Sequence, residues 1–347
     1  MSVKRIGVLT GGGDAPGLNA VIRAIVVTSD KYGIKVLGIK RGWAGLLDGG
    51  EVEPIALEDV DDIHRTGGTI LGTSRTNPMK HPNGIDQIKR NLEKYDCDAL
   101  VAIGGDDTLG VALKLHEDGI KIVGVPKTID NDLSATDYTF GFDTAINIGT
   151  EAIDRLHTTA MSHDRVMVVE IMGRYAGWLT LNAGMAGGAH IILVPEEKFD
   201  VDEVCRVIRE RRKAGYNYTI VAVAEGAVPT DARDFITKDD KVDEFGHVKL
   251  GGIAKRLSKV IEKKTGQETR EVILGHLQRG GAPSAFDRML GTRLGVKAVQ
   301  LILAEKFGEM TSLRGTEITS VSIAEAVGKL KLVDKALLEE VKLFMGR

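Results

Sequence analysis

Short apolar runs alternate along the chain with stretches of helical apolar spacing, and this alternation limits the possible folds more than any other feature. The runs that we interpret as buried strands are Ile6–Leu9, Val36–Ile39, Ala99–Ile103, Ile122–Val125, Val166–Ile171, Ile191–Val194, Ile220–Ala224 and Val272–Leu274. The stretches that we interpret as helices are Leu18–Val27, Asp86–Tyr95, Leu109–His116, Asn147–Met161, Val201–Lys213, Ile253–Lys264, Arg288–Ala304 and Lys335–Phe344. Such alternation predicts an α/β fold of mostly parallel sheets with helices on both faces.

The chain is long enough for two domains, because it contains 347 residues. Residues 132–142 contain few periodic apolar positions, which favours a break between two sheets and a cleft between two α/β domains. Residues 231–248 are polar and predict an exposed loop or hairpin.

Composition excludes several classes of protein. The formal net charge of −3 gives no basic field for nucleic acid, and no apolar run approaches the length of a membrane span. Cys97 and Cys205 show neither disulfide nor metal-site spacing. We expect a cytoplasmic protein, since the first strand begins near the N-terminus without a signal sequence.

Polar side chains follow two of the predicted strands directly. Gly104–Thr108 places Asp106, Asp107 and Thr108 after one strand, and 127–132 places a Lys, a Thr and two more Asp after the next. Ligands of open α/β sheets bind beyond the carboxyl ends of the strands. Acids there can hold Mg²⁺ or act as a base, and Lys and backbone N–H groups can hold phosphate. The alternative is turn and N-cap chemistry, which Asp, Asn and Thr also favour.

A glycine-rich turn follows the first strand. Gly11, Gly12 and Gly13 would present backbone N–H groups to a phosphate at the start of a helix. The dinucleotide and P-loop fingerprints both fail here, because Pro16 takes a glycine position and no Gly-Lys-Ser/Thr follows. A plain tight turn with Pro16 in the first helical turn is the alternative.

Further polar groups surround the later strands. They are Arg165, the segment Met172-Gly173-Arg174, Glu225, and Arg270 with His276 and Arg279. Two Arg and a His around one strand suit a phosphate monoester, and Glu225 suits sugar hydroxyls. The earlier strands supply residues that bind a donor phosphate, acids for Mg²⁺ and a candidate base. Together with this second phosphate pocket, they indicate phosphoryl transfer to a small phosphorylated acceptor.

Six motifs together identify the chain as resembling the 6-phosphofructokinase family. They are GGGDAPGLNA, GGTILGTSR, GGDDT, PKTIDND, MGR and GHLQRGG, and they occur in the family order over residues 5 to about 305. The resemblance implies two α/β domains with substrate between them. It places the phosphoryl-donor domain at residues 1–141 plus about 278–328. The sugar-phosphate domain would be 142–277 plus a C-terminal helix at about 329–347.

The resemblance also implies a role for each site residue. Asp130 would take the proton from the 1-hydroxyl of fructose 6-phosphate, Thr128 and Arg174 would assist catalysis, and Asp106 and Asp132 would hold Mg²⁺. The implied donor-binding residues are Gly11, Gly12, Gly13, Arg75, Asp107, Thr108 and Lys127. The implied acceptor-binding residues are Arg165, Met172, Gly173, Glu225, Arg270, His276 and Arg279. Arg165 and Arg270 would complete the site of a neighbouring subunit, which implies a homodimer or homotetramer.

Two positions resemble the pyrophosphate-dependent members of the family. ATP users resemble GGDG[ST], whereas this chain has Asp107 at the fourth position, and many have Gly where Lys127 stands. Like charges about 4 Å apart repel by roughly 4 kcal/mol at an effective dielectric constant of 20, so Asp107 would reject the α-phosphate of a nucleotide. Lys127 is the weaker marker, because some ATP users also have Lys there. Val111 would crowd the adenine pocket.

The resemblance predicts weak control by nucleotide or phosphoenolpyruvate. Arg23 is retained at the effector site, but Val27, His157 and His190 replace charged residues there.

Three alternatives stay open from the sequence. The first is an ATP-dependent 6-phosphofructokinase with the same fold. The second is a non-catalytic sugar-phosphate sensor, against which Asp130 argues because a sensor needs no base. The third is a dehydrogenase, which the missing dinucleotide fingerprint disfavours.

Overall fold

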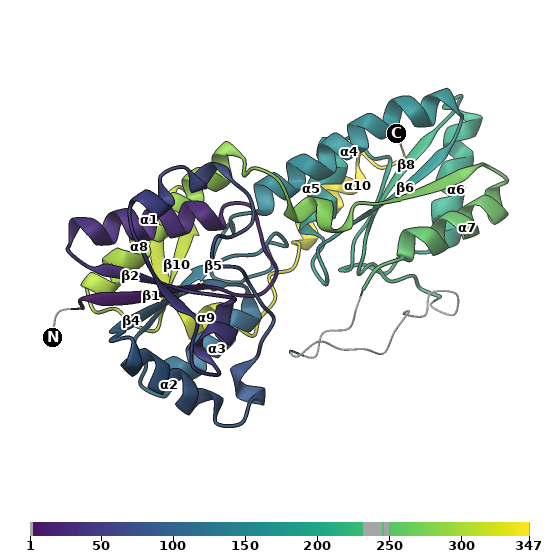
Figure 1. The fold of residues 1–347 in the computed structure, drawn as a ribbon. Helices are drawn as coiled ribbons and strands as arrows, with labels where there is room; N and C mark the ends of the chain where they lie inside the picture. The colour runs from purple at the N-terminus through teal and green to yellow at the C-terminus, as the bar shows by residue number, and fades with distance from the viewer. Residues whose placement is uncertain (1–2, 232–244, 246–249, 347) are drawn as a thin grey trace.

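Two separate sheets organise the chain in the computed structural model, which describes residues 3–231, 245 and 250–346. The larger has the strand order β11-β10-β5-β4-β1-β2-β3, and the smaller has the order β7-β8-β6-β9. Figure 1 shows them as two lobes joined by several crossings of the chain. The predicted α/β class with mostly parallel sheets is confirmed.

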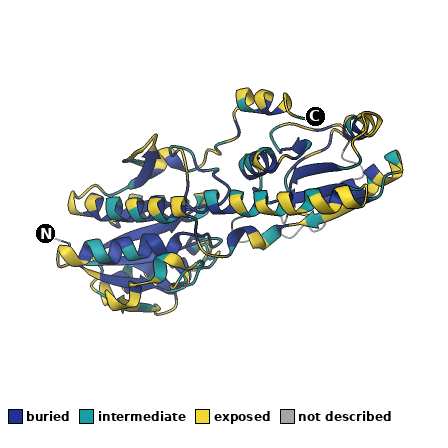
Figure 2. Ribbon diagram, turned by 90° about the horizontal axis from the view of Figure 1, so that it is seen from above, coloured by how far each residue is buried: buried dark blue, intermediate teal, exposed yellow. Residues whose placement is uncertain are grey.

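Helices cover both faces of the larger sheet. Its strands are β1 (Arg5–Thr10), β2 (Lys35–Ile39), β3 (Val52–Ile55), β4 (Ala99–Gly104), β5 (Ile122–Pro126), β10 (Glu309–Arg314) and β11 (Glu317–Ser322). One core joins the sheet to α1 (Leu18–Lys31) and α8 (Ala285–Leu303). A second core, on the opposite face, joins it to α2 (Gly84–Lys94) and α3 (Asp106–Glu117). Figure 2 shows the buried strands between helices whose outer faces are exposed.

The smaller sheet has the same three layers. Its strands are β6 (Val166–Ile171), β7 (Ile191–Leu193), β8 (Thr219–Ala224) and β9 (Thr269–Ile273), all parallel. One face packs on α4 (Phe142–Ser162), α5 (Trp178–Ala186) and α10 (Lys335–Lys342). The other face packs on α6 (Val201–Lys213) and α7 (Ile253–Thr265). The helix α10 therefore joins the second lobe, although β10, β11 and the short α9 (Ile323–Ala326) belong to the first.

The sequence interpretation missed three strands and two helices. β3 is an edge strand that contains a proline, and only half of its residues are partly buried. The β10–β11 hairpin is rich in Thr and Ser, so it lacks an apolar run. The helix α5 is apolar on nearly all sides and shows no amphipathic period, and α9 is only 4 residues long.

Two sequence predictions have no structural test here. Most of the polar segment 231–248 lies outside the described residues, and the exact domain bounds stay a prediction. Among the described residues, no helix is long and apolar enough to cross a membrane.

Candidate active site

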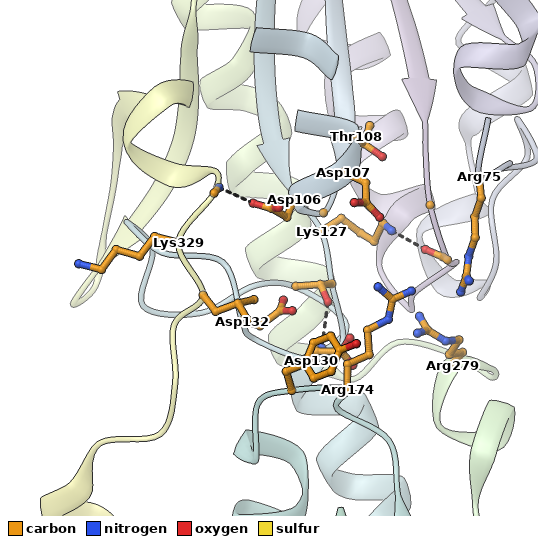
Figure 3. A pocket seen from close by; sticks show the side chains of 17 residues that line it. Arg75, Asp106, Asp107, Thr108, Lys127, Asp130, Asp132, Arg174, Arg279 and Lys329 are labelled. Carbon is orange, nitrogen blue, oxygen red and sulfur yellow. Dashed lines mark hydrogen bonds between the residues drawn. The ribbon is translucent and has the colours of Figure 1, made fainter. Parts of the chain in front are cut away.

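The carboxyl ends of β4 and β5 open into a cavity of about 270 Å³. The two strands are parallel neighbours, with Gly104 opposite Pro126, so the residues that follow each strand emerge side by side. Figure 3 shows the cavity and the charged side chains around it. Of the residues predicted from sequence, those that line it are Gly12, Gly13, Arg75, Asp106, Asp107, Thr108, Lys127, Thr128, Asp130, Asp132, Arg174 and Arg279.

The glycine-rich turn after β1 packs closely on the start of α3. A Cβ at Gly11 would lie 2.6 Å from the Thr108 hydroxyl oxygen, and Gly12 has a φ of +78°. Both positions therefore need glycine. The turn is also held by backbone bonds from Gly11 N–H to the Ile103 carbonyl and from Gly12 N–H to the Ser74 carbonyl.

Lys127 is buried beside this turn, with only 3% of its surface exposed. Its Nζ donates a hydrogen bond to the carbonyl oxygen of Gly13 (Figure 3). Burial, followed by the nearby Arg279 guanidinium, lowers the pKa of Lys127 to about 7. An anion bound in the cavity would favour the charged form of this lysine.

Four carboxylates occupy the same cavity. Asp106 and Asp107 form the first turn of α3, where the helix dipole favours negative charge. Burial and the neighbouring Asp130 carboxylate raise the pKa of Asp132 to about 7. Asp130 is buried, its N–H donates to the Thr128 hydroxyl at 3.0 Å, and its Oδ1 has no hydrogen-bond partner among the described residues.

Three arginines face these acids across the cavity. Figure 3 shows Arg75 and Arg279 on the side opposite Asp106 and Asp132, with Arg174 near Asp130. Arg279 comes from the turn after β9, and its Nη1 donates to the Asp14 carbonyl at 3.1 Å. The cavity thus carries both cations and acids, as a metal-bound phosphate would require.

The predicted acceptor residues lie at the carboxyl ends of strands in the smaller sheet. Glu225 follows β8, and its Oε1 accepts backbone N–H groups from Gly173 (3.3 Å) and Arg174 (3.0 Å). Burial raises the pKa of Glu225. His276 is exposed in the turn after β9. Met172, Gly173, Glu225 and His276 do not line the 270 Å³ cavity itself.

Arg165 and Arg270 lie at the amino ends of their strands, opposite the carboxyl ends that carry the other acceptor residues. Arg165 directly precedes β6, Arg270 is the second residue of β9, and both pair with Glu268. The length of β9 separates Arg270 from His276, so one chain cannot form the Arg270–His276 phosphate pocket that the sequence suggested.

The predicted effector residues do not form one cluster. Arg23 on α1 donates to the Asp61 carbonyl, and Val27 packs against the first core. His157, His190 and Tyr218 stack edge to face, with ring centroids 5.3–5.7 Å apart. Burial lowers the pKa of His190 to about 3, so its imidazole is neutral near pH 7.

Several residues of the site were given no role from the sequence. Tyr175 and the segment Gly328–Leu330 also border the cavity, although the segment follows no strand and matches no motif. Gln278 is fully buried, and its side-chain oxygen accepts the Met172 N–H at 2.9 Å. It stands inside a quoted motif and was given no role. No group of three or more His, Cys, Asp or Glu in the described part of the chain could hold a metal without other ligands.

A family model described as phosphofructokinase matches residues 5–302. The chain belongs to the phosphofructokinase family. The family expected from the motifs is thereby confirmed, and the chain is an enzyme of this family.

Phosphofructokinase structures share its fold. Phosphofructokinase from Pichia pastoris, solved in the T-state, superposes with a TM-score of 0.85 at 32% identity, over 99% of this chain and 39% of the yeast chain. This chain therefore spans well under half of that longer protein. Pyrophosphate-dependent phosphofructokinase from Marinobacter aquaeolei superposes with a TM-score of 0.82 at 24% identity, over 99% and 92% of the two chains, which shows the fold alone.

Relatives of this phosphofructokinase carry two different names. A protein of Streptomyces coelicolor named pyrophosphate–fructose 6-phosphate 1-phosphotransferase is 57% identical over 99% of this chain and 100% of its own length. A protein of Mycobacterium tuberculosis named ATP-dependent 6-phosphofructokinase is 49% identical, also over 99% and 100%. The resemblance to pyrophosphate-dependent members is confirmed, while identity of this order does not by itself separate the two donors.

Proposed function

We propose that this phosphofructokinase transfers a phosphoryl group from pyrophosphate to the 1-hydroxyl of fructose 6-phosphate. The products are fructose 1,6-bisphosphate and phosphate, in a reversible step of glycolysis and gluconeogenesis in the cytoplasm. The observation that carries the proposal is Asp107, a carboxylate in the wall of the cavity at the first turn of α3.

Asp107 disfavours a nucleotide for an electrostatic reason. A donor phosphate held by the glycine-rich turn would direct any further phosphate and nucleoside toward the start of α3. A phosphate charge about 4 Å from the Asp107 carboxylate would meet roughly 4 kcal/mol of repulsion at an effective dielectric constant of 20. Pyrophosphate ends before that point and avoids the repulsion.

Pyrophosphate has no base or sugar, so it must bind through charge. Lys127, Arg75 and Arg279 supply that charge around one small cavity. The buried position of Lys127 supports this role, because a lysine with a lowered pKa gains most from an anion nearby. The Thr108 hydroxyl would add a neutral donor. The N–H groups of Gly11 and Gly12 already donate to backbone carbonyls, so they would not contribute.

The cavity also fits Mg²⁺, the metal that the family implies. Asp106 and Asp132 would hold it together with oxygens of the donor, because Mg²⁺ prefers one or two carboxylates plus phosphate and water. The raised pKa of Asp132 supports this, since burial beside another carboxylate is the setting that a cation stabilises. When bound, Mg²⁺ would neutralise charge on the transferred group.

Asp130 is the proposed general base. Its Oδ1 is buried, unpaired within the described structure and close to the cavity, so it is available to accept the proton of the sugar hydroxyl. Thr128 orients the Asp130 backbone, and Arg174 would stabilise charge on the transferred group. Met172, Gly173 and Glu225 would hold the sugar.

The 6-phosphate would be bound by His276 and two arginines of a second copy, whereas Arg279, which the resemblance assigned to the 6-phosphate, lies in the donor cavity. Arg165 and Arg270 lie at the amino ends of their strands, away from the acceptor residues of their own chain. This position supports the proposal that they bind the 6-phosphate in a neighbouring subunit of a homodimer or homotetramer. ATP is the second candidate donor, because relatives named ATP-dependent are 49% identical.

The reverse reaction tests this proposal. Purified enzyme with fructose 1,6-bisphosphate, Mg²⁺ and inorganic phosphate should release fructose 6-phosphate and pyrophosphate in equal amounts. Omitting phosphate should stop the reaction, and replacing phosphate with ADP should not restore it. Turnover with ADP and none with phosphate would assign the enzyme to the ATP-dependent class.

A further inference from the structure

Residues 328–333 form a strap that crosses from one lobe to the other past the cavity. The strap begins after α9, which packs in the larger lobe, and leads into α10, which packs in the smaller one. Figure 1 shows this yellow segment passing between the lobes, and Figure 3 shows it beside Asp106 and Asp132. Nothing in the proposed chemistry uses the strap.

The first half of the strap binds the two proposed metal ligands. The Gly328 N–H donates to Asp106 Oδ1 at 2.8 Å. The Lys331 N–H donates to the backbone carbonyl of Asp132 at 2.8 Å, and Leu330 forms a bridge with Leu133. One oxygen of Asp106 is thus fixed by the strap, which leaves the other for a ligand.

Lys331 anchors the strap through its side chain. Its Nζ donates to the carbonyl oxygens of Thr136 (2.9 Å) and Asp137 (2.8 Å). The Nζ also lies 5.5 Å from the centre of the Trp178 ring. These bonds hold the strap against the loop that carries Asp130 and Asp132.

The second half of the strap binds the start of α5. Trp178 Nε1 donates to the Lys331 carbonyl at 2.7 Å. Glu196 Oε1 accepts both the Val333 N–H at 2.9 Å and the Gly177 N–H at 2.8 Å. Gly177 and Trp178 lie shortly after the segment Met172–Arg174 that is proposed to hold the sugar.

We propose that the strap positions Asp106 and Asp132 for the metal, with Lys331 and Trp178 as positioning residues. Partners that orient metal-binding carboxylates typically change metal affinity or activity by about 10–100-fold when they are removed. The inference rests on the proposed function only for the identity of the metal ligands, because the contacts themselves are independent of the donor.

The test uses Lys331→Met and Trp178→Phe in the full-length enzyme. Lys331→Met removes the anchoring ammonium, and Trp178→Phe keeps the ring but removes the N–H that binds the Lys331 carbonyl. Lys331→Arg tests rescue of the charge, and Lys335→Met, at an exposed position at the start of α10, is the matched control. The Mg²⁺ concentration at half-maximal rate should rise about tenfold in both variants, while the KM for fructose 6-phosphate stays within twofold and saturating Mg²⁺ restores kcat.

A second readout is independent of turnover. Mn²⁺ binding to the enzyme with inorganic phosphate present and sugar absent, followed by the electron paramagnetic resonance signal of free Mn²⁺, should weaken in Lys331→Met and Trp178→Phe. Weaker Mn²⁺ binding in an enzyme that uses ATP would refute the proposed donor and leave the strap inference intact. A lower kcat at every Mg²⁺ concentration, with unchanged Mn²⁺ binding, would overturn the inference and leave the strap a structural link.

Discussion

Asp107 and Lys127 lie in one cavity wall but affect the donor in different ways. Asp107 acts by exclusion, because its carboxylate repels a nucleotide phosphate. Lys127 acts by attraction, since it is buried next to the glycine-rich turn. The two residues therefore allow separate tests of exclusion and of binding.

Asp107→Gly should let the enzyme accept ATP. Removing roughly 4 kcal/mol of repulsion predicts a gain in kcat/KM for ATP of up to about a thousandfold. Asp107→Asn removes the charge without opening space, so it should give a smaller gain and separate charge from volume. Steady-state rates with each donor measure the effect, and no gain with ATP in either variant would contradict the electrostatic explanation.

Lys127 should make the stability of the ligand-free enzyme depend on pH. The unfolded chain keeps this proton up to about pH 10.5, whereas the folded protein releases it near pH 7. Between these values the unfolded state binds more protons, so the contribution of Lys127 to the free energy of unfolding rises with pH.

Denaturant titrations of wild type and Lys127→Met at pH 6.5, 8 and 9.5 measure this contribution. The wild type should gain stability relative to the variant as pH rises, and Lys335→Met should show no such trend. Parallel curves for wild type and Lys127→Met would contradict the lowered pKa.

The helices α4 and α8 meet through one buried carboxylate. Asp287 Oδ2 accepts the Thr144 N–H at 2.8 Å and the Thr144 hydroxyl at 2.5 Å. Burial raises the pKa of Asp287 to about 6. Because α8 packs on the larger sheet and α4 on the smaller, this contact joins the two lobes.

Thr144→Val should lower the free energy of unfolding by about 1.5–3 kcal/mol, because a hydrogen bond to a buried charged group is lost without a change of shape. Thr158→Val, at an exposed position on the same helix, should change it by less than about 0.5 kcal/mol. Chemical denaturation measures both, and equal effects would show that the Asp287 contact is unimportant.

The elements that the sequence predicted well are those with a strong apolar signal. Short buried runs such as Ala99–Ile103 were correctly interpreted as strands. The motifs that follow these runs in the sequence therefore lie at the carboxyl ends of the strands. The hairpin of β10 and β11 was missed because its buried Thr311 and Ser312 are polar. The strap was missed because it has no apolar run or motif, and because its partners lie far away in the sequence, as Asp106 does from Gly328.

At the scale of the whole molecule, the proposed acceptor site needs residues from more than one chain. Arg165 and Arg270 lie at the amino ends of β6 and β9, whereas Met172 and His276 follow the carboxyl ends of these strands. The family resemblance predicted that these arginines serve a neighbouring subunit, whereas the residue pattern alone grouped Arg270 with His276 around one strand. If the two arginines bind substrate in a neighbouring subunit, as proposed, their position away from the site of their own chain is explained.

Mixing two inactive variants tests that arrangement. Arg165→Ala lacks the shared arginine, and Asp130→Asn lacks the base, so neither homo-oligomer should work well. After subunits exchange, a hybrid contains one site with both residues intact, and activity should recover to about a quarter of wild type in a symmetric dimer. No recovery in proven hybrids would place Arg165 outside the neighbour's site.

The forward reaction with the two donors tests the central claim most directly. The kcat/KM of the wild-type enzyme should be measured for pyrophosphate and for ATP at saturating fructose 6-phosphate and Mg²⁺. We predict a ratio of at least about 10³ in favour of pyrophosphate, as roughly 4 kcal/mol of repulsion requires. Equal values, or turnover with ATP alone, would contradict the account.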